Sequence, residues 1–268
     1  SHGHGYAPLG IPALRDRVAD LLTERGVPTG RDEVAITLGV QHGITLAAEV
    51  VAGPGRRVAI EDPTYPGAID VYTRAGLHLA ALRVDRAGTD PAALRALLGR
   101  EPVDVVHLSP QCASPTGTVT TAGRCEELAE ILAGSDAWLV EDAALEFLAP
   151  QDGQRYLTAA LPERSILLGT VSKVFWGGLR VGWLRAPAAV VDRVGRLRAA
   201  HDLGSPIAPQ VTALRLLDEL GPIGDRRRAE ASARRAHLTA ALRDRVPGVS
   251  CDEPGGGLSL WLRVPDAE

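Results

Sequence analysis

Lys173 is the only lysine of the 268-residue chain, so 28 of the 29 Lys and Arg residues are arginines. Surface charge and salt bridges tolerate arginine almost everywhere, but a guanidinium stays charged and cannot form an imine. A lysine amine can lose its proton and attack a carbonyl, as Schiff-base lysines do. The single lysine therefore indicates covalent chemistry at Lys173; taken alone, a chance survivor on an exposed loop explains it equally well.

The neighbours of Lys173 are typical of a ligand site at the end of a strand. Residues 165–169 form an apolar run that reads as a buried strand, and Thr170 and Ser172 then add two hydroxyl groups. Two glycines and Arg180 follow. A lysine at the carboxyl end of a strand, beside hydroxyls, glycines and an arginine, favours a cofactor site over a solvated surface.

Two earlier segments supply further parts of such a site. Gly39, Val40 and Gln41 stand where a helix is expected to begin, and the backbone N–H groups of a helix N-terminus suit a phosphate. Tyr65 follows a predicted strand, where its ring can stack on a planar ligand. By themselves, these features also fit an ordinary turn and a packed tyrosine.

Two polar side chains follow later strands. Ser114 lies in the turn 109–117, and Asp142 puts a carboxylate at the end of a strand, where a helix cap is the structural alternative. A phosphate cradle, a ring stacker, a carboxylate for a pyridinium nitrogen and the amine of Lys173 together describe a site for pyridoxal 5′-phosphate. The order and spacing of the parts carry this prediction.

Strand and helix patterns alternate through the first two thirds of the chain. The expected helices are 11–25, 41–51, 66–75, 90–98 and 121–132, and the expected strands are 57–61, 77–84, 103–108, 137–140 and 165–168. The strands are short and apolar on both faces, which predicts an α/β fold with a largely parallel sheet covered on both sides. Ligands of such sheets bind beyond the carboxyl ends of the strands, where the candidate residues fall.

From Ala188 onward the pattern becomes helical. Helices are expected over 188–200, 206–220 and 224–245. The alternating segment 258–264 reads as a strand of a second, smaller domain. We therefore expect a large cofactor-binding domain, 1–187, followed by a region, 188–268, with interdomain helices and the truncated beginning of a small C-terminal α+β domain.

Composition narrows the function classes. The net charge of −4 and the pI near 6.0 give no overall attraction to nucleic acid or membrane, and the arginines at 226–228 and 234–235 are more typical of a solvated helix face. No run suits a membrane helix or a signal peptide. Three cysteines without CxxC spacing predict a cytoplasmic, reducing setting with no disulfide framework and no metal site. Because the chain lacks methionine, we expect a fragment or a processed chain.

The chain resembles fold-type-I, class I/II aminotransferases from Tyr6-Ala7-Pro8-Leu9-Gly10 to Trp261, nearly its whole length. The resemblance implies a three-layer α/β/α fold and pyridoxal 5′-phosphate as the cofactor. It implies that Lys173 forms the imine with the cofactor, Asp142 pairs with the pyridine nitrogen and Tyr65 stacks on the ring.

The same resemblance implies which residues bind the phosphate of the cofactor. It would be held by Thr170, Arg180 and the turn at Val40 and Gln41, and Tyr6 would reach the phosphate of the neighbouring subunit. A homodimer with shared sites follows. The candidate set is completed by Gly39, Ser114 and Ser172.

Four segments resemble more narrowly the aminotransferase-like part of MocR-type regulators in the GntR family of bacterial transcription factors. They are Glu61-Asp62-Pro63-Thr64-Tyr65-Pro66, residues 172–183, His201-Asp202-Leu203-Gly204-Ser205-Pro206 and Gly256-Gly257-Leu258-Ser259-Leu260-Trp261. In such regulators a winged helix-turn-helix precedes this domain, which senses through pyridoxal phosphate. Contact with DNA would therefore run through a domain that these 268 residues do not contain.

The sequence departs from the aminotransferase pattern at four places. Ser114 stands where the family has an asparagine donor before Pro-Thr-Gly, and Ala144 and Leu145 stand where a tyrosine donor is usual. Val40 replaces a frequent hydroxyl residue, and the arginine that grips a substrate carboxylate would lie beyond Glu268. Cofactor anchoring is thus expected to be intact, and transaminase turnover weak or absent.

These observations favour a sensor domain of a MocR-type regulator. It would bind pyridoxal 5′-phosphate (PLP) and, as effector or substrate, a small amine or amino acid. The alternative is a free-standing aminotransferase acting on an amino acid or similar amine. A scaffold that has lost the cofactor is a third reading, against which the position of the sole lysine argues.

Overall fold

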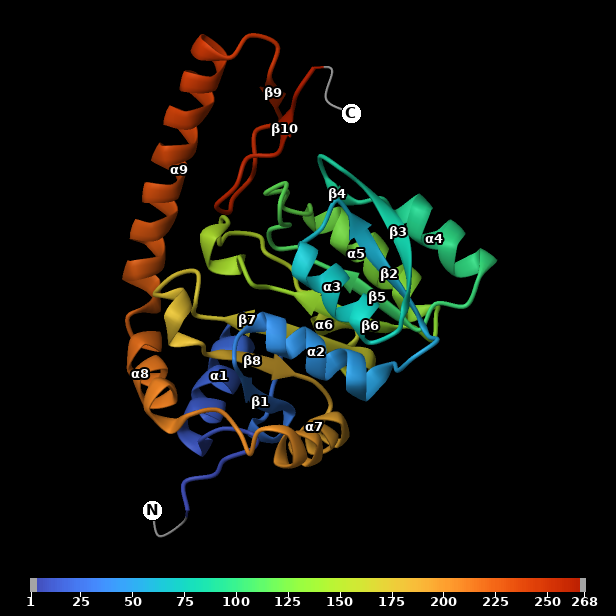
Figure 1. The fold of residues 1–268 in the computed structure, drawn as a ribbon, viewed down its shortest axis with the longest axis vertical. Coiled ribbons are helices and arrows are strands. Elements are labelled where there is room, and N and C mark those ends of the chain that lie inside the picture. The colour runs from blue at the N-terminus through green and yellow to red at the C-terminus, as the bar shows by residue number, and fades with distance from the viewer. Residues whose placement is uncertain (1–3, 266–268) are drawn as a thin grey trace.

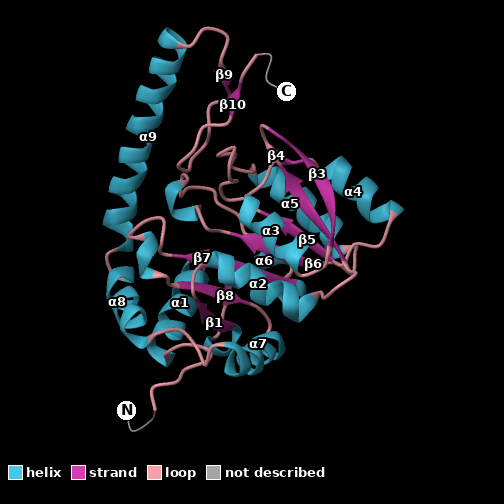
Figure 2. Ribbon diagram, viewed as in Figure 1, coloured by secondary structure: helices cyan, strands magenta, loops and turns pink. Residues whose placement is uncertain are grey.

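A computed structural model describes residues 4–265, built around one eight-stranded sheet with helices on both faces (Figures 1 and 2). The strands are β1 Val34–Thr37, β2 Arg57–Asp62, β3 His78–Asp85, β4 Gly88–Thr89, β5 Val105–Leu108, β6 Trp138–Asp142, β7 Ser165–Thr170 and β8 Gly182–Arg185. Their order across the sheet is β1-β8-β7-β6-β5-β2-β3-β4. The five central strands β7, β6, β5, β2 and β3 run parallel, so the predicted three-layer, mostly parallel architecture is confirmed.

Apart from the four-residue α6, which was not predicted, the helices occupy nearly the predicted ranges. They are α1 Pro12–Glu24, α2 Val40–Val51, α3 Pro66–Arg74, α4 Pro91–Arg100, α5 Ala122–Ala133, α6 Leu157–Ala160, α7 Ala188–His201, α8 Ile207–Leu217 and α9 Leu220–Arg245, with short 3₁₀ helices at Arg31–Glu33, Glu146–Leu148, Pro162–Arg164 and Gly177–Leu179. As expected, α4 begins with Asp90 as N-cap: its Oδ1 accepts a hydrogen bond from Ala92 N at 2.9 Å, and Pro91 follows it.

Two hydrophobic layers enclose the sheet because its strands are apolar on both faces. Helices α2, α3 and α7 pack on one face through a cluster that includes Ile44, Tyr72 and Val191. On the other face, α1 and α8 pack over the end of the sheet that carries β1, and α4, α5 and α6 pack over the opposite end. Burial on both faces explains why the central strands lack a polar alternation.

The strand predictions need correction. The sequence predicts neither β1 and β8, which pair antiparallel at one end of the sheet, nor the two-residue β4, which pairs antiparallel with β3 at the other end. β8 pairs with both β7 and β1. The segment 258–264 is not one strand, because only Leu262–Arg263 (β10) pairs, with Ser250–Cys251 (β9). The 26-residue helix α9 runs along one side of the molecule and leads to this small hairpin (Figure 1).

Candidate functional site

A cavity of about 330 Å³ lies at the carboxyl edge of the parallel strands. Ten of the eleven candidate residues line it: Gly39, Val40, Gln41, Tyr65, Ser114, Asp142, Thr170, Ser172, Lys173 and Arg180. The sheet explains this convergence, because β2, β5, β6 and β7 end at one edge and the residues that follow these strands meet there.

The antiparallel strand β8 adds Arg180 to the same edge. Since β8 runs opposite to β7, the two residues before β8, Arg180 and Val181, lie beside the residues that follow β7. Gly182 must lack a side chain here: a Cβ would lie 2.7 Å from the carbonyl oxygen of Gly169 and 2.8 Å from the Cα of Gly39. This close approach brings the start of α2 next to Arg180.

The start of α2 has the form of an anion cradle. Gly39 is the N-cap with a φ of +91°, and no side chain caps the first N–H groups of the helix. The guanidinium of Arg180 lies 3.4 Å from the place that a Cβ on Gly39 would occupy, and it donates to the carbonyl of Leu38. Uncapped helical N–H groups beside an arginine suit a phosphate, which is the fit that the predicted cofactor requires.

Arg180 is held in an unusual backbone conformation. Its φ of 54° lies in the left-handed region that few non-glycine residues adopt. The hydroxyl of Thr170 secures the adjacent residue by donating to the carbonyl of Val181 at 2.8 Å, and Thr170 Oγ1 accepts from Ser172 N at 3.1 Å. Thr170 thus joins the end of β7 to the start of β8, and the hydroxyl of Ser172 lies 3.0 Å away.

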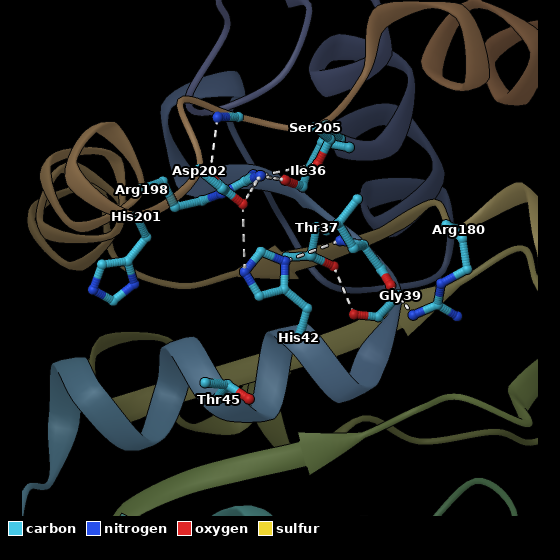
Figure 3. Close-up of polar contacts among 12 residues, drawn as sticks. Ile36, Thr37, Gly39, His42, Thr45, Arg180, Arg198, His201, Asp202 and Ser205 are labelled. Carbon is cyan, nitrogen blue, oxygen red and sulfur yellow. Dashed lines mark hydrogen bonds and ion pairs between the residues drawn. The ribbon is translucent and has the colours of Figure 1, made fainter.

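An ion pair between a buried arginine and a solvent-accessible aspartate fixes the far side of this cradle (Figure 3). The side chain of Arg198, on α7, is fully buried and pairs with Asp202 through Nη2 at 2.9 Å. It also donates to Ser205 Oγ at 3.0 Å and to the carbonyl of Ile36 at the end of β1. The segment after α7 is therefore tied to the strand that leads into the cradle.

His42 completes this network from the first turn of α2 (Figure 3). Its Nδ1 accepts a hydrogen bond from Leu38 N at 3.1 Å, and its Nε2 lies 3.9 Å from Asp202 Oδ2. Burial lowers the pKa of His42 to about 4, with a further lowering from Arg198. A neutral ring is what the bond from Leu38 requires, because Nδ1 must carry a free lone pair.

Asp142 is the buried carboxylate of the cavity. Its Oδ1 accepts from Ala144 N at 2.8 Å, and no other hydrogen bond reaches it within residues 4–265. Burial raises the pKa of Asp142 to about 6, and the bond from Ala144 and the positive charge of Lys173 oppose that rise. A cationic ring nitrogen in the cavity suits this carboxylate, which has few partners of its own.

Tyr65 stands at the cavity wall, directly before α3. Its ring lies over Gly67, where a Cβ would approach Tyr65 Cε1 to 2.5 Å. The amide of Gln41 donates to the carbonyl of Gly67 at 3.0 Å, and its buried Oε1 has no partner among the described residues. The tyrosine, glycine and glutamine thus hold one another at the entrance to the cradle.

The rest of the lining is largely apolar. Ala144 and Leu145 line the cavity, so the two positions at which the family usually has a tyrosine donor do face it, and Ser114 lines the same cavity. Sequence reasoning did not single out Cys112 or Leu258, which also line it, and gave no role to His42 and Arg198. Cys112 and Leu258 are apolar and match no ligand-binding motif. Arg198 lies far from the cradle in sequence, so no local pattern indicates its role.

Tyr6 is the one candidate outside the cavity. Its side chain is 68% exposed near the start of the described chain. The adjacent Ala7 bridges to Gly204, where a Cβ would meet the carbonyl of Ala7 at 2.3 Å. Tyr6 therefore projects from the surface close to the segment that supports the cradle, and its role in a neighbouring subunit stays a prediction.

Comparison with known proteins agrees with this geometry. The family described as aminotransferase class I and II matches residues 1–268. The chain belongs to this aminotransferase family. The kynurenine aminotransferase of Pyrococcus horikoshii superposes with a TM-score of 0.91 at 26% identity, covering 99% of this chain and 68% of that one. The α-aminoadipate aminotransferase LysN of Thermus thermophilus, solved with N-(5′-phosphopyridoxyl)-L-leucine, gives 0.91 at 28%, covering 97% and 68%. The fold-type-I prediction is thus confirmed.

Relatives of the chain in this aminotransferase family include transcriptional regulators. The HTH-type transcriptional regulator TauR of Rhodobacter capsulatus is 33% identical over 258 residues, 92% of this chain and 51% of TauR. The 2-aminoadipate transaminase of Thermus thermophilus is 28% identical over 270 residues, 97% of this chain and 65% of the enzyme. The chain spans about half the length of the curated regulators that it matches. Within residues 4–265, none of the helices has the length and apolar character needed to cross a membrane.

Proposed function

We propose that this chain is the PLP-binding, aminotransferase-like sensor domain of a MocR-type regulator of the GntR family. The observation that carries the proposal is a cavity with a full set of anchoring groups and an apolar wall. Lys173, Asp142 and Arg180 line it together with the uncapped start of α2, whereas Ala144 and Leu145 supply no side-chain donor. Similarity to TauR over 92% of the chain supports the regulator.

Pyridoxal 5′-phosphate is the cofactor that this site suits. Lys173 would bind its aldehyde, Asp142 would face the ring nitrogen and Tyr65 would cover the ring. The phosphate would meet the N–H groups of Val40 and Gln41 together with the groups of Thr170, Ser172 and Arg180, beside Gly39 and Ser114. When bound, the cofactor supplies an aldehyde that captures amines and a ring that accepts electrons.

Slow or absent turnover is part of the proposal. Donors to an ionised oxygen lower its affinity for a proton, and the wall at Ala144 and Leu145 offers none from its side chains. The hydroxyls of Ser109, Ser114 and Ser259 line the same cavity, and Ser114, at the position of the family's asparagine donor, would replace them in part. We therefore propose weak or absent turnover, which suits a domain that registers an amine rather than converts it.

The proposal includes the oligomeric state of the chain and its contact with DNA. The chain would act in the cytoplasm as a homodimer, with Tyr6 of each subunit reaching the site of the other. DNA would be bound only through a domain outside these 268 residues. Residues 1–187 would form the cofactor-binding domain, and residues 188–268 would form interdomain helices and the beginning of a small C-terminal domain.

A free-standing aminotransferase is the second candidate. Similarity to the 2-aminoadipate transaminase over 97% of the chain favours it, and so does the presence of the lysine, aspartate and arginine in one cavity. Brisk multiple-turnover transamination of a common amino acid by this chain would decide for the enzyme. Under the sensor proposal, a panel of amino acids changes the cofactor's absorbance once, without sustained release of keto acid.

Replacing Lys173 tests the cofactor chemistry. We expect Lys173→Ala to abolish covalent capture of PLP, because the chain contains no other side-chain amine. The measurement is the absorbance band of the imine, followed by borohydride reduction and mass-spectrometric mapping. A matched control is Lys173→Ala with Arg243→Lys, which returns an exposed lysine on α9 and should not restore the band. A band in the single variant, or a label confined to the N-terminus of the wild type, contradicts the assignment.

A further inference from the structure

The N-terminal segment, residues 7–11, lies along the outer edge of β1, the strand that leads into the phosphate cradle. Ile36 N donates to the carbonyl of Leu9 at 2.9 Å, and Gly10 N donates to the carbonyl of Ala7 at 2.9 Å. Gly10 has a φ of +92°, and a Cβ on it would lie 2.3 Å from Ile36 Cγ1. The segment therefore packs so closely on β1 that Gly10 has no room for a side chain.

Gln210, in the first turn of α8, holds this segment in place. Its side chain is fully buried, and its Oε1 accepts a hydrogen bond from Ile11 N at 2.8 Å. Its Nε2 donates to the carbonyl of Ser205 at 2.8 Å and lies 3.3 Å from the carbonyl of Pro206. One buried amide, used as both donor and acceptor, thus joins the N-terminal segment to the loop between α7 and α8.

Both contacts of Gln210 lead to Ile36, at the end of β1. On one side, the segment that ends at Ile11 bonds to the N–H of Ile36. On the other, Arg198 donates to Ser205 Oγ at 3.0 Å and to the carbonyl of Ile36 (Figure 3). Ile36 is therefore held through both of its polar backbone groups, and both supports end at Gln210.

The position of Ile36 matters because the cradle follows it directly. Thr37 Oγ1 donates to the carbonyl of Gly39 at 3.0 Å, and Gly39 is the N-cap of α2. The backbone of Gly39 also packs directly on Gly182, where a Cβ would lie 2.8 Å from Gly39 Cα. Groups that bind a ligand must be held to within about 0.5 Å, so a displaced β1 would misplace the N–H groups that face a phosphate.

We propose that Gln210 is a positioning residue for the phosphate of the cofactor, because it docks residues 7–11 on β1 and so fixes the start of α2. The inference rests on the proposed function, since it takes PLP as the ligand. Within the described chain, Gln210 is not part of the cavity lining, so it acts on the phosphate through Ile36 and not by contact. Its loss should therefore affect the phosphate and spare the capture of an aldehyde at Lys173.

Pyridoxal, which has the aldehyde and ring of PLP but no phosphate, tests this role when its capture is compared with that of PLP. We expect Gln210→Met, which removes the amide and keeps an unbranched side chain, to weaken PLP capture about tenfold. Pyridoxal capture at Lys173 should stay within about twofold of wild type. Gln210→Glu keeps an acceptor for Ile11 N and should recover part of the PLP affinity. The measurement is titration of the imine absorbance band.

The matched control is Gln151→Met. The amide of Gln151 likewise accepts one hydrogen bond, from Arg25, and donates to two carbonyls, those of Glu146 and Ala149. It lies outside the lining of the cavity. Gln151→Met should therefore leave the ratio of PLP to pyridoxal affinity within about twofold of wild type. A wild-type ratio in Gln210→Met, or an equal change of the ratio in Gln151→Met, overturns the proposal.

Amide hydrogen exchange on the wild-type chain adds a measurement that needs no variant. PLP should slow exchange at Ile11 N and Ile36 N, and pyridoxal should not, because only the phosphate fixes the cradle. Equal exchange rates with the two ligands contradict the proposal.

Tyr6 precedes the docked segment and offers a second route to a phosphate. In a Tyr6→Ala background, Gln210→Met should lower the PLP affinity by the same factor; loss of the effect there refutes the route through β1. The proposed function fails separately: it is wrong if the wild-type chain captures neither PLP nor pyridoxal at Lys173. If the wild type captures both and Gln210→Met keeps their ratio, only the role of Gln210 is wrong.

Discussion

At the scale of single residues, Asp142 is the buried carboxylate of the cavity, and its charged form has few stabilising partners. It is buried, accepts one hydrogen bond from Ala144 and has a pKa raised to about 6. A buried carboxylate is stabilised in its charged form only by a nearby donor or cation. The cation it now senses is Lys173, which a bound aldehyde would engage.

Asp142→Asn should leave PLP bound but electronically altered. Without the carboxylate, nothing in this part of the cavity favours a protonated ring nitrogen, so the ring becomes a poorer acceptor of electrons. We expect slower single-turnover reaction with any accepted amino acid, measured by stopped-flow absorbance. Asp136→Asn, an exposed carboxylate before the opposite end of β6, is the control. Equal rates in Asp142→Asn and wild type would remove Asp142 from this role.

His107 is a second buried titratable residue, outside the cavity. Its Nδ1 lies 3.0 Å from the hydroxyl of Tyr72, and the two rings pack edge to face. Its Nε2 has no partner within the described chain, and burial lowers the pKa of His107 to about 4. The folded protein therefore keeps this ring neutral under mildly acidic conditions, in which the unfolded chain binds a proton.

Because the folded protein keeps His107 neutral, its free energy of unfolding should fall as the pH falls. An unfolded histidine has a pKa near 6.5, so the unfolded state gains protons from about pH 6.5 down to about pH 4, where the folded state follows. Between pH 7 and 4.5 we expect wild type to lose ~2 kcal/mol relative to His107→Gln. Urea unfolding at both pH values measures this difference. His78→Gln, at an exposed histidine of β3, should show no such pH-dependent difference; parallel curves for all three proteins would contradict the assignment.

At the scale of elements, the cradle depends on α7 as well as α2. Arg198 and Asp202 connect the end of α7 to Ile36 at the end of β1, and His42 connects Asp202 to the loop before α2. The anion site is thus held from behind by a segment more than 150 residues away in sequence. Its geometry is a property of the packed elements rather than of the turn alone.

Asp202→Ala should weaken both the fold and the cradle. The fully buried guanidinium of Arg198 would lose its charged partner, and leaving a buried donor unsatisfied costs about 1–3 kcal/mol. We expect a lower free energy of unfolding in urea and weaker PLP binding by fluorescence titration. Asp192→Ala, on the exposed face of α7, is the matched control. If Asp202→Ala lowers the free energy of unfolding but leaves the PLP affinity unchanged, the Arg198–Asp202 network does not support the phosphate cradle.

Helices and strands could be predicted where a short stretch of sequence carries the pattern that specifies them. The parallel strands stood out as apolar runs, and α4 was marked by Asp90 and Pro91. β8 was missed because it begins with Gly182 and contains a buried arginine, Arg185, whereas the apolar run of β1, Val34-Ala35-Ile36-Thr37, was readable and was overlooked. Arg185 is accommodated by Glu33 at 2.8 Å, a partner more than 150 residues away that no local pattern reveals.

The cavity was predictable for a related reason. Residues that follow parallel strands converge whatever the loops between them do, so ten candidates could be expected together. The support behind them could not, because Arg198 reads as an ordinary helix arginine until its burial is known. The packing of α9 was likewise hidden, because Arg227 and Arg235 fit a solvated helix face until their hydrogen bonds to the carbonyls of Val174 and Gly257 are known.

At the scale of the whole molecule, the surface position of Tyr6 bears on assembly. Tyr6 lies outside the cavity of its own chain, near the segment at Gly204 that supports the cradle. If each subunit completes the site of the other, cofactor affinity depends on the partner chain. A monomer by light scattering that binds PLP with full affinity would contradict the shared site.

Mixed dimers give the sharper test. Tyr6→Ala should weaken PLP binding without changing the capture chemistry at Lys173. Pairing a Tyr6→Ala subunit with a Lys173→Ala subunit leaves one site with both the lysine and a tyrosine from the partner. We expect that site to bind PLP as tightly as wild type, measured by titration of the absorbance band. Equal weakness in the Tyr6→Ala homodimer and the mixed dimer would show that Tyr6 acts within its own chain.

The sole lysine has a consequence for every amine-directed modification of this chain. Acylating enzymes, isothiocyanate dyes and amine cross-linkers all require a side-chain amine, and Lys173 is the only one, exposed at the cavity. The group that would tether the cofactor is therefore also the only side-chain amine open to such labelling. Cofactor and label compete for one atom, so the fraction of side-chain labelling reports the fraction of vacant sites.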